Sequence, residues 1–400
     1  MTSLTTAPPR VFLNPGQDRR VARGHPWAYA NEIRMDAATK ALPPGIVVQL
    51  CRVDGKPLGV GTFNPHALIA FRLFASDPNV VIDRGFFADR LAAALDLRAC
   101  LFDGPYYRLL HAEADGVPGL VVDRFGAAVV IQASTAGMEA LLPAFLSALD
   151  DTLAPSVVVL RNDGAGRTLE GLDSYARVAK GTLSGPVEVR EDDLTFLADP
   201  LAGQKTGWFF DQRDNRAFVG LLCRNVARVL DVYCYAGGFA VAAAAAGARA
   251  VIGIDRSEPA LVLAKQAAER NGVAARCAFR PAEAFATLES LAAAGERFDV
   301  VIADPPAFAK SKKELPSGLK GYRKLARLAA VAVAPKGFLF IASCSHNVEA
   351  AAFADEIARG LAAAGRTGRI LRAAGAASDH PIHPHLPETG YLKTLTLQLD

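Results

Sequence analysis

The 400-residue sequence lacks closely spaced cysteines, long apolar runs and a large excess of charge of either sign. Its six cysteines include no C-x-x-C pair, which argues against a zinc ribbon and against a dense disulfide framework. His380, His383 and His385 are interleaved with prolines and are followed by no further ligands at metal-binding spacing. We therefore expect reduced thiols and no bound metal.

No apolar run is as long as a membrane span, because Arg249 and Lys336 interrupt the best candidates. The opening residues, MTSLTTAPPR, contain no apolar stretch of the kind that export signals carry. We therefore expect a cytoplasmic protein that makes no contact with a membrane.

The charge balance excludes a strong global field. The chain has 44 Lys and Arg against 41 Asp and Glu, a formal charge of +3. Any contact with nucleic acid must therefore come from local basic patches. The length, together with a 51% hydrophobic composition, predicts two or three domains with substantial cores.

The N-terminal stretch from about residue 10 to 74 predicts a small β-rich module, because short apolar runs alternate with Pro-Gly, Asp-Gly and Asn-Pro turns. A basic group, Arg19, Arg20 and Arg23, precedes the aromatic residues Trp27 and Tyr29. Such a pattern grips phosphates and stacks on bases. A solvated charged turn beside two core aromatics explains it nearly as well.

A second module follows a polar linker at residues 76–83. The run 84–102 has helical spacing, and short strands, a helix near 138–149 and a strand at 157–160 complete a small α+β unit. It contains no catalytic constellation. We interpret its acids, Glu113, Asp115 and Asp123, as turn and surface residues.

The remainder of the chain alternates strands and helices, beginning with a helix expected at 215–224. This alternation predicts a mostly parallel, doubly wound sheet. Ligands of such sheets bind at the carboxyl ends of the strands, near the switch in strand order. Candidate functional residues should therefore directly follow the strands.

The stretch 226–248 is the first of these strand ends. An apolar strand leads to Asp231, Ala236, Gly237 and Gly238 allow a tight turn, and an alanine-rich helix begins. The spacing is not the G-x-G-x-x-G of a dinucleotide site. Any strand-to-helix turn of an α/β domain remains an alternative interpretation.

Acids also follow the next strands. Asp255 stands 24 residues after Asp231, where an acid accepts hydrogen bonds from both hydroxyls of a ribose. Glu283 is a candidate acceptor for an adenine amino group, although an acid at a helix N-terminus is the simpler interpretation.

The last two strand ends carry reactive groups. Asp304-Pro305-Pro306-Ala307-Phe308 fixes a carboxylate in an extended turn. Ser343-Cys344-Ser345 places a thiol in a position expected of a nucleophile. We assign the other five cysteines as small core residues.

Together these residues resemble those of class I S-adenosylmethionine-dependent methyltransferases, and more narrowly the bacterial large-subunit ribosomal RNA 5-methylcytosine methyltransferases of the PUA-domain type. The resemblance extends over almost the whole chain. Its markers are HPWAYANEI, HAEADGVPGLVVDRFG, GQKTGWFFDQRDNR and DHPIHPHLPETGYLK.

The resemblance implies three domains: a PUA-like RNA-binding domain at 1–78, a small α+β domain at 79–190, and a Rossmann-like methyltransferase domain at 191–400. The last would have a seven-stranded, mostly parallel sheet ending in an antiparallel hairpin. The implied cofactor is S-adenosylmethionine and the implied partner is large-subunit ribosomal RNA; a homodimer is compatible with the sequence. The cofactor-binding residues would be Asp231, Tyr233, Ala236, Gly237, Gly238, Asp255, Arg256, Glu283, Ala284, Asp304, Lys205, Thr206, Phe209, Asp211 and Gln212.

The resemblance further implies cytosine C5 methylation through a covalent cysteine adduct, with Cys344 as the nucleophile and Asp304 bonded to the N3 edge of the base. Many such enzymes carry a second cysteine where this chain has Ala307. Candidate RNA contacts, besides the N-terminal arginines, are Lys310, Lys312, Lys313 and His380. Two alternatives stay open: methylation of a ring nitrogen or exocyclic amine, and a non-catalytic RNA-binding assembly factor.

Overall fold

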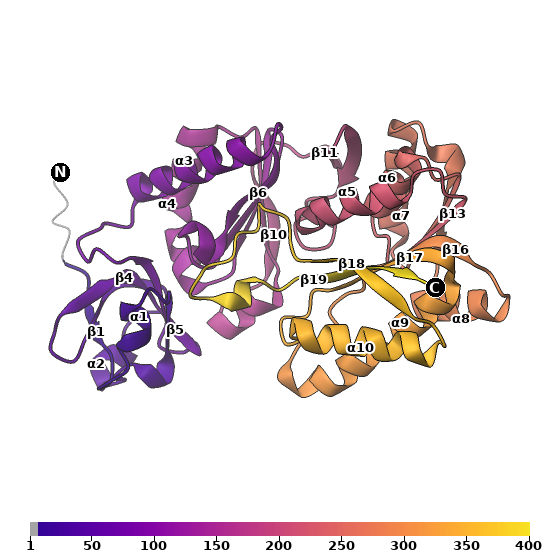
Figure 1. Ribbon diagram of the computed structural model, residues 1–400. Coiled ribbons are helices and arrows are strands. Elements are labelled where there is room, and N and C mark those ends of the chain that lie inside the picture. The colour runs from indigo at the N-terminus through magenta and orange to yellow at the C-terminus, as the bar shows by residue number, and fades with distance from the viewer. Residues whose placement is uncertain (1–6) are drawn as a thin grey trace. The chain divides into compact units, whose positions relative to one another are not determined.

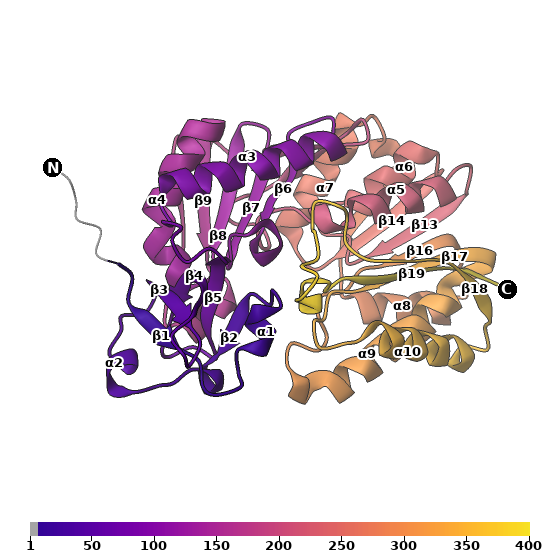
Figure 2. The ribbon, with the colours of Figure 1, turned by 60° about the vertical axis from the view of Figure 1, so that its left-hand side comes forward.

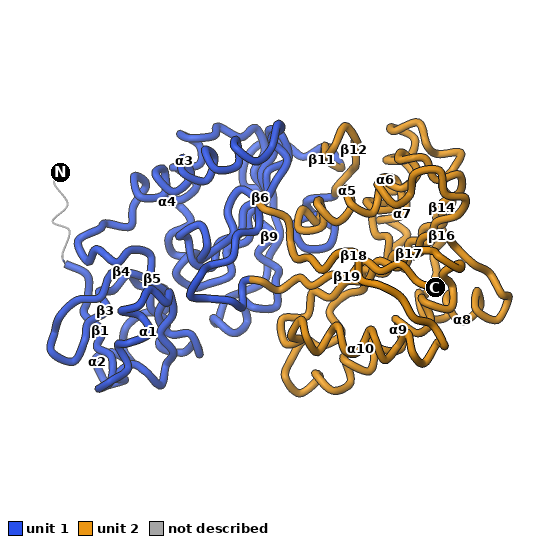
Figure 3. Tube along the Cα trace, viewed as in Figure 1, with its two compact units in different colours: residues 1–185, 199–207, 379–389 blue, residues 186–198, 208–378, 390–400 orange. Residues whose placement is uncertain are grey.

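The computed structural model describes residues 7–400. Residues 1–6, part of the opening segment in which we expect no export signal, lie outside the described residues. The chain forms two compact units, and three segments contribute to each (Figure 3). Unit 1 comprises residues 1–185, 199–207 and 379–389, and unit 2 comprises residues 186–198, 208–378 and 390–400. The division into domains at residues 78 and 190 stays a prediction.

Unit 1 begins with the predicted β-rich module (Figure 1). Its five strands lie in the order β1-β3-β4-β5-β2, with β1 parallel to β3 and the other pairs antiparallel. Alternate residues such as Val48 and Leu50 face a buried core. The elements are β1 (Arg10–Phe12), α1 (Arg19–Ala22), β2 (Trp27–Tyr29), α2 (Ala37–Lys40), β3 (Ile46–Cys51), β4 (Pro57–Phe63) and β5 (Ile69–Ala75).

The second module of unit 1 is a five-stranded sheet, ordered β10-β9-β8-β7-β6, with two long helices. Asp83 and Thr135 cap these helices by accepting hydrogen bonds from the backbone N–H groups of Phe86 and Met138. The helix α3 starts at the expected residue, 84, and α4 starts at residue 136, two residues before the expected start. The elements are α3 (Arg84–Leu101), β6 (Tyr106–His111), β7 (Leu120–Phe125), β8 (Ala128–Ala133), α4 (Ala136–Leu153), β9 (Val157–Asn162) and β10 (Tyr175–Lys180).

The interpretation of the acids in this module as surface residues is wrong. Asp123 is fully buried and forms a two-pronged ion pair with Arg108, with N···O distances of 2.8 and 2.9 Å. Asp115 pairs in the same way with the fully buried Arg98, at 2.6 and 2.8 Å. Glu113 is 8% exposed and pairs with Arg72. Buried carboxylates need such partners, and here arginines of the same unit supply them.

Unit 2 contains the seven-stranded sheet, ordered β15-β14-β13-β16-β17-β19-β18. Pairs from β15 to β17 are parallel, whereas β19 is antiparallel to both β17 and β18. Figures 1 and 2 show α5, α6 and α7 on one face of this sheet and α8, α9 and α10 on the other. The predicted doubly wound fold with a terminal antiparallel hairpin is confirmed.

The elements of unit 2 follow the predicted alternation, although the first helix begins at residue 213 and ends at 222, two residues before the predicted range. None of the helices within residues 7–400 is both long and apolar enough to cross a membrane. The elements are β11 (Val187–Glu191), β12 (Leu194–Ala198), α5 (Arg213–Leu222), β13 (Arg228–Val232), α6 (Gly238–Ala246), β14 (Ala250–Asp255), α7 (Glu258–Arg270), β15 (Cys277–Pro281), α8 (Ala284–Ala293), β16 (Phe298–Ala303), α9 (Leu315–Ala332), β17 (Val333–Ser343), α10 (Ala350–Ala363), β18 (Gly368–Ala374) and β19 (Lys393–Leu399).

Candidate active site

The glycine turn lies at the carboxyl end of β13, next to β16, where the strand order reverses. Gly237 has a φ of +79°, a left-handed conformation that residues with a side chain rarely adopt. A Cβ atom on Gly237 would also lie 2.8 Å from Cβ of Ala264. Gly238 begins α6, and Ala236 is fully buried behind the turn. The turn therefore requires glycine at position 237 for two independent reasons.

Asp231 is a buried carboxylate that the described residues leave without a partner. It is 1% exposed, and neither of its oxygens has a hydrogen-bond partner within residues 7–400. Burial raises the pKa of Asp231 well above its usual value, and the neighbouring carboxylates of Asp304 and Asp255 raise this pKa further. The nearby backbone N–H of Ala240, which forms no hydrogen bond with either oxygen, opposes the rise only in part. Three carboxylates around one buried position favour a cationic ligand group there.

Asp255 ends β14, the strand beside β13. One of its oxygens accepts a hydrogen bond of 2.9 Å from the N–H of Tyr235, and the other accepts one of 2.8 Å from the N–H of Ser257. These bonds fix the carboxylate at the strand end. Each oxygen keeps a second lone pair, so the predicted contact with a ribose is compatible with this geometry.

Apolar residues lie near the third strand end. Tyr233, Ala282 and Phe285 are partly buried and pack against one core cluster. Glu283 is exposed and caps α8 by accepting a hydrogen bond of 2.8 Å from the N–H of Ala286. The geometry therefore shows Glu283 as a helix cap, and its contact with adenine stays a prediction. The cofactor-binding roles of Arg256, which is exposed, and Ala284, which is buried, also stay predictions.

Two of the predicted residues, far apart in the sequence, are in direct contact. Nε2 of Gln212 donates a hydrogen bond of 2.9 Å to Oδ2 of Asp304, and Nδ2 of Asn215 donates one of 2.7 Å to Oε1 of Gln212. Gln212 is 2% exposed and Asn215 is equally buried. The segment before α5 thus holds the carboxylate that follows β16.

The neighbours of Gln212 are held in the same region of unit 2. The OH of Tyr391 donates a hydrogen bond of 2.5 Å to Oδ2 of Asp211. The ring of Phe209 meets the ring of Tyr235 edge-on, with centroids 5.3 Å apart. Phe209 and Gln212 therefore contact residues that follow β13 and β16, whereas Asp211 is bonded to the segment before β19; the cofactor-binding role of all three stays a prediction.

Cys344 directly follows β17 and is partly buried. The next residue, Ser345, is fixed through its hydroxyl: Oγ lies 2.8 Å from the OH of Tyr322 and accepts a hydrogen bond of 3.2 Å from the N–H of Ala309. The ring of Phe308 lies tilted against the ring of Tyr322, with centroids 4.7 Å apart. The loop that carries Cys344 is thus tied to the loop that begins with Asp304.

The other five cysteines divide into three groups, which are buried, partly buried and exposed. Cys51, Cys223 and Cys234 are buried, as predicted, and burial raises the pKa of the Cys223 thiol to about 12. Cys277 is partly buried, and burial raises its pKa to about 11. The assignment of Cys100 to the core is wrong, because this residue is exposed on α3. Of these five, Cys234 also lies just after a strand of the seven-stranded sheet, β13, but it is buried, and burial raises the pKa of its thiol well above the usual value.

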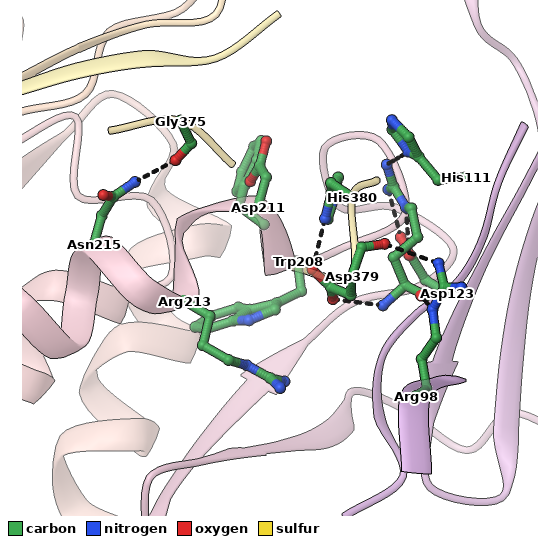
Figure 4. A network of polar contacts seen from close by, with 12 residues as sticks. Arg98, His111, Asp123, Trp208, Asp211, Arg213, Asn215, Gly375, Asp379 and His380 are labelled. Carbon is green, nitrogen blue, oxygen red and sulfur yellow. Dashed lines mark hydrogen bonds and ion pairs between the residues drawn. The ribbon is translucent and has the colours of Figure 1, made fainter. Parts of the chain in front are cut away.

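Some predicted residues belong to unit 1. Thr206 is buried and donates a hydrogen bond of 2.5 Å to Asp123, whereas Lys205 is exposed. His380 is 5% exposed, and its Nδ1 lies 2.7 Å from a carboxylate oxygen of Asp379. Figure 4 shows Asp379 linked to both His380 and Arg98. The roles of Lys205 and Thr206 in cofactor binding and of His380 in RNA binding stay predictions.

The predicted RNA-contacting residues differ in exposure. Arg19 and Arg23 are exposed on and beside α1, whereas Arg20 forms an ion pair of 2.7 Å with Glu32. Lys310, Lys312 and Lys313 are exposed in the loop that follows β16. Five of these six side chains are therefore accessible to a phosphate backbone.

Sequence reasoning missed Tyr322, Ser345 and Asn215 as members of the site. One signal pointed to Tyr322: a Cβ on Gly318 would lie 2.8 Å from Cβ of Ala309, and one on Gly321 would lie 3.0 Å from the ring of Phe308. Two glycines three residues apart on α9 let this helix approach the loop after β16 closely. No comparable local signal marks the others.

Comparison with known proteins supports this architecture. Residues 11–76 match the family of PUA-like domains, and residues 172–372 match the family described as S-adenosylmethionine-dependent methyltransferases. Among solved structures, a proposed SAM-dependent methyltransferase from Streptococcus mutans has the same fold, with a TM-score of 0.82 at 18% identity over 98% of this chain and 100% of that one. A proposed methyltransferase complexed with SAH gives a TM-score of 0.82 at 19% identity, over the same shares of the two chains.

Curated relatives resemble the chain over nearly its full length. The protein named ribosomal RNA large subunit methyltransferase I of Cronobacter sakazakii is 35% identical over 96% of this chain and 98% of its own. The protein of the same name from Aeromonas salmonicida is also 35% identical, over 97% of this chain and 98% of its own.

Proposed function

The chain belongs to the S-adenosylmethionine-dependent methyltransferases, in the family of the ribosomal RNA large subunit methyltransferase I proteins, and from this premise we propose that it methylates cytosine C5 in large-subunit ribosomal RNA through a covalent adduct of Cys344. The observation that carries the proposal is the position of this thiol, in a loop tied through Ser345 to the loop of Asp304.

The residues present suit the cofactor. S-adenosylmethionine, when bound, supplies an electrophilic methyl group on a positively charged sulfur. Asp231 is buried without a hydrogen-bond partner within residues 7–400, and Asp255 and Asp304 lie close enough to raise its pKa. A cationic methionine portion would neutralise this cluster. The turn at Gly237 allows the close backbone approach that such a ligand needs.

The chemistry explains why a thiol is needed. Cytosine C5 is a weak nucleophile, so the thiolate of Cys344 first adds to C6: a sulfur–carbon bond forms, and the electron pair of the C5–C6 double bond moves into the ring to give an enamine. C5 then attacks the methyl carbon and takes it from the sulfonium, whose sulfur keeps the bonding electron pair. Loss of the C5 proton to a base finally restores the double bond and expels the thiolate.

Asp304 is proposed to assist the addition. Each oxygen of a carboxylate has two lone pairs, so a hydrogen bond to the N3 edge of the base is compatible with the bond that Oδ2 of Asp304 accepts from Gln212. Favouring protonation at N3 draws electrons from C6 towards the ring nitrogen and makes C6 more electrophilic. The same bond would also position the base relative to Cys344.

The proposed substrate rests on two observations. Both curated relatives carry the name of a ribosomal RNA large subunit methyltransferase, and residues 11–76 match the PUA-like family. The exposed residues Arg19, Arg23, Lys310, Lys312 and Lys313 are the proposed phosphate contacts. A ribosomal RNA substrate implies action in the cytoplasm. A homodimer stays a prediction of the sequence, which sedimentation of the purified protein would test.

Covalent trapping tests the cysteine mechanism directly. On RNA containing 5-fluorocytosine, the wild-type protein with S-adenosylmethionine should form a complex stable to denaturation, because fluorine at C5 cannot leave as a proton does. Cys344→Ala should form none and should not methylate RNA, while still binding the cofactor by calorimetry. Cys100→Ala is the matched control, because this thiol is exposed but remote in sequence from every strand end of the sheet.

A methyltransferase that modifies a ring nitrogen or an exocyclic amine is the main alternative, since Asp304-Pro305-Pro306 followed by Phe308 also suits an amino group held for direct transfer. Such an enzyme would methylate RNA in the Cys344→Ala variant and would give no trapped complex. A non-catalytic assembly factor would transfer no labelled methyl group even in a single turnover.

A further inference from the structure

Lys393 opens β19 and lies opposite the last residue of β17 in the antiparallel pair, Ser343. Its Nζ donates a hydrogen bond of 2.7 Å to the backbone carbonyl of Ser345. The side chain thus extends from Ser343 to Ser345, the two residues that flank Cys344. Lys393 and the nucleophile are brought together by strand register alone, although they lie far apart in the sequence.

Among residues 7–400, no carboxylate pairs with the charge of Lys393. The side chain is partly buried, and no carboxylate of residues 7–400 makes an ion pair with its ammonium group within 4.0 Å. Burial lowers the pKa of Lys393, and the thiol of Cys344 is the neighbour that raises it. A desolvated ammonium group is stabilised by a nearby anion, and the thiolate of Cys344 is the group able to supply one.

The other ionisable groups of this part of unit 2 lie on α9 and in the segments after β16, after β17, before β19 and before α5. Tyr322 of α9 faces Cys344, and burial raises the pKa of this tyrosine, so that its hydroxyl stays neutral. Asp304 follows β16, whose neighbour in the sheet is β17. His346 follows Cys344, and its ring lies 5.2 Å from that of Tyr391, which precedes β19. The hydroxyl of Tyr391 is bonded to Asp211. Among the groups named here, Lys393 is the one that carries a lysine ammonium group.

We propose that Lys393 is a positioning residue that holds the loop of Cys344 and stabilises the thiolate of Cys344 by its positive charge. The proposal rests on the proposed function, in which Cys344 is the nucleophile. A nearby ammonium group increases the thiolate fraction at neutral pH and so favours addition to C6. It equally stabilises the thiolate that departs when the C5–C6 double bond is restored, since a less basic thiolate leaves faster.

The second effect answers a question posed by the sequence. Ala307 stands where many RNA 5-methylcytosine enzymes carry a second cysteine that assists product release. A single-cysteine enzyme needs another way to release its product. Stabilisation of the departing thiolate by Lys393 would provide this route to product release.

Three substitutions separate charge from hydrogen bonding. Lys393→Arg keeps both the charge and a donor, Lys393→Gln keeps a donor without the charge, and Lys393→Met removes both. Lys265→Met is the matched control, because Lys265 is an exposed lysine on α7. Thermal unfolding and calorimetric binding of S-adenosylmethionine verify that each variant folds.

The measurement is the rate at which iodoacetamide alkylates Cys344, followed by mass spectrometry of its peptide as a function of pH. The Gln and Met variants should shift this profile upward by about one pH unit, and so alkylate about tenfold more slowly at pH 7. Lys393→Arg and Lys265→Met should keep the wild-type profile. In methyl transfer, the Gln and Met variants should lose kcat while the KM for S-adenosylmethionine stays constant.

Two results would overturn the role of Lys393: coincident profiles for wild type and both neutral variants, or a shift in the Met variant with a wild-type profile for Gln, which would reduce the role to a hydrogen bond. Either result leaves the proposed function intact as long as Cys344→Ala is inactive. Conversely, an active Cys344→Ala variant refutes the covalent mechanism whatever the alkylation profiles are, so the two failures are distinguishable.

Discussion

The side-chain amide of Gln212 donates a hydrogen bond of 2.9 Å to Oδ2 of Asp304, across 92 positions of sequence. Gln212 precedes α5, whereas Asp304 follows β16. Asn215 in turn donates to Oε1 of Gln212, which fixes the orientation of the amide so that its NH₂ faces the carboxylate. Gln212 therefore helps to fix the position of the carboxylate of Asp304.

Gln212→Glu should impair methyl transfer more than Gln212→Met. Glutamate still accepts the bond from Asn215, but it sets a second carboxylate against Asp304, and like charges at this distance disfavour ionisation of one of them. We expect a loss of about 100-fold in kcat/KM for Glu and about tenfold for Met, as for lost positioning contacts. Steady-state kinetics with RNA measure both. Equal losses in the two variants would contradict the role of charge.

Asp231→Asn should stabilise the free protein and yet weaken cofactor binding. Burial raises the pKa of Asp231 well above 3.8, so ionisation of the folded protein at neutral pH is costly, and the amide removes this cost. The difference in Tm between variant and wild type should therefore be present at pH 7 and disappear as pH falls below about 3.8, where the unfolded carboxyl is protonated too. Differential scanning calorimetry measures this dependence.

The same variant should bind S-adenosylmethionine about 10- to 100-fold more weakly in isothermal titration, because the cationic group loses its buried counter-charge. Asp163→Asn is a control, since this side chain is 37% exposed. A variant that gains stability and keeps its affinity would remove Asp231 from the cofactor site.

Gly237→Ala should destabilise unit 2 by about 2–4 kcal/mol, the sum of a left-handed φ and an overpacked Cβ. The second contribution is separable, because the atom that the new methyl group would meet at 2.8 Å is Cβ of Ala264. Gly237→Ala combined with Ala264→Gly should recover the packing part but not the conformational part. Urea unfolding of both variants, with Ala264→Gly alone as the reference, tests this, and complete recovery would mean that backbone conformation contributes nothing.

Much of the candidate site follows from sequence because of one property of parallel sheets. Asp231 is the last but one residue of β13, Asp255 ends β14, and Asp304 and Cys344 directly follow β16 and β17. The carboxyl ends of parallel strands meet at one edge of a sheet. The alternation of strands and helices thus predicts their proximity without knowledge of any side-chain contact. The glycine turn is equally readable, because only glycine combines φ of +79° with the close approach of Ala264.

Contacts that depend on register or on distant segments are not readable in this way. Lys393 approaches Cys344 only because β19 pairs antiparallel with β17 in one register, which moves Lys393 opposite Ser343. Arg108 and Asp123 are likewise cross-strand partners on β6 and β7. Asp379 joins Arg108 from 271 positions away. From the sequence, such acids are expected at the surface, because the arginines that pair with them are distant in the sequence.

Asp123→Asn should test how much that buried pairing stabilises unit 1. Removing one charge leaves Arg108, which is 9% exposed, without its two-pronged partner, and such losses cost about 3–5 kcal/mol. The surface pair of Arg84 with Asp151 is the matched comparison, because both of its side chains are at least 45% exposed, and Asp151→Asn should cost less than about 1 kcal/mol. Denaturant unfolding of the two variants measures both costs. Similar costs would mean that the Asp123 pair is no more important than a surface one.

Replacing Lys310, Lys312 and Lys313 by Gln should weaken RNA binding and make the affinity less dependent on salt concentration. The three side chains are exposed in the loop after β16, at the carboxyl edge of the sheet where the candidate site lies. Each phosphate contact on single-stranded RNA contributes about 0.7 to the slope of log K against log salt, so the slope should fall by about two. Cofactor affinity should not change. A charge-matched control replaces three other exposed residues, Lys265, Arg297 and Lys336. Arg297 and Lys336 lie at the amino ends of β16 and β17, away from the candidate site. If both triple variants reduce the slope equally, binding follows net charge, and the loop after β16 is not the RNA-contacting surface.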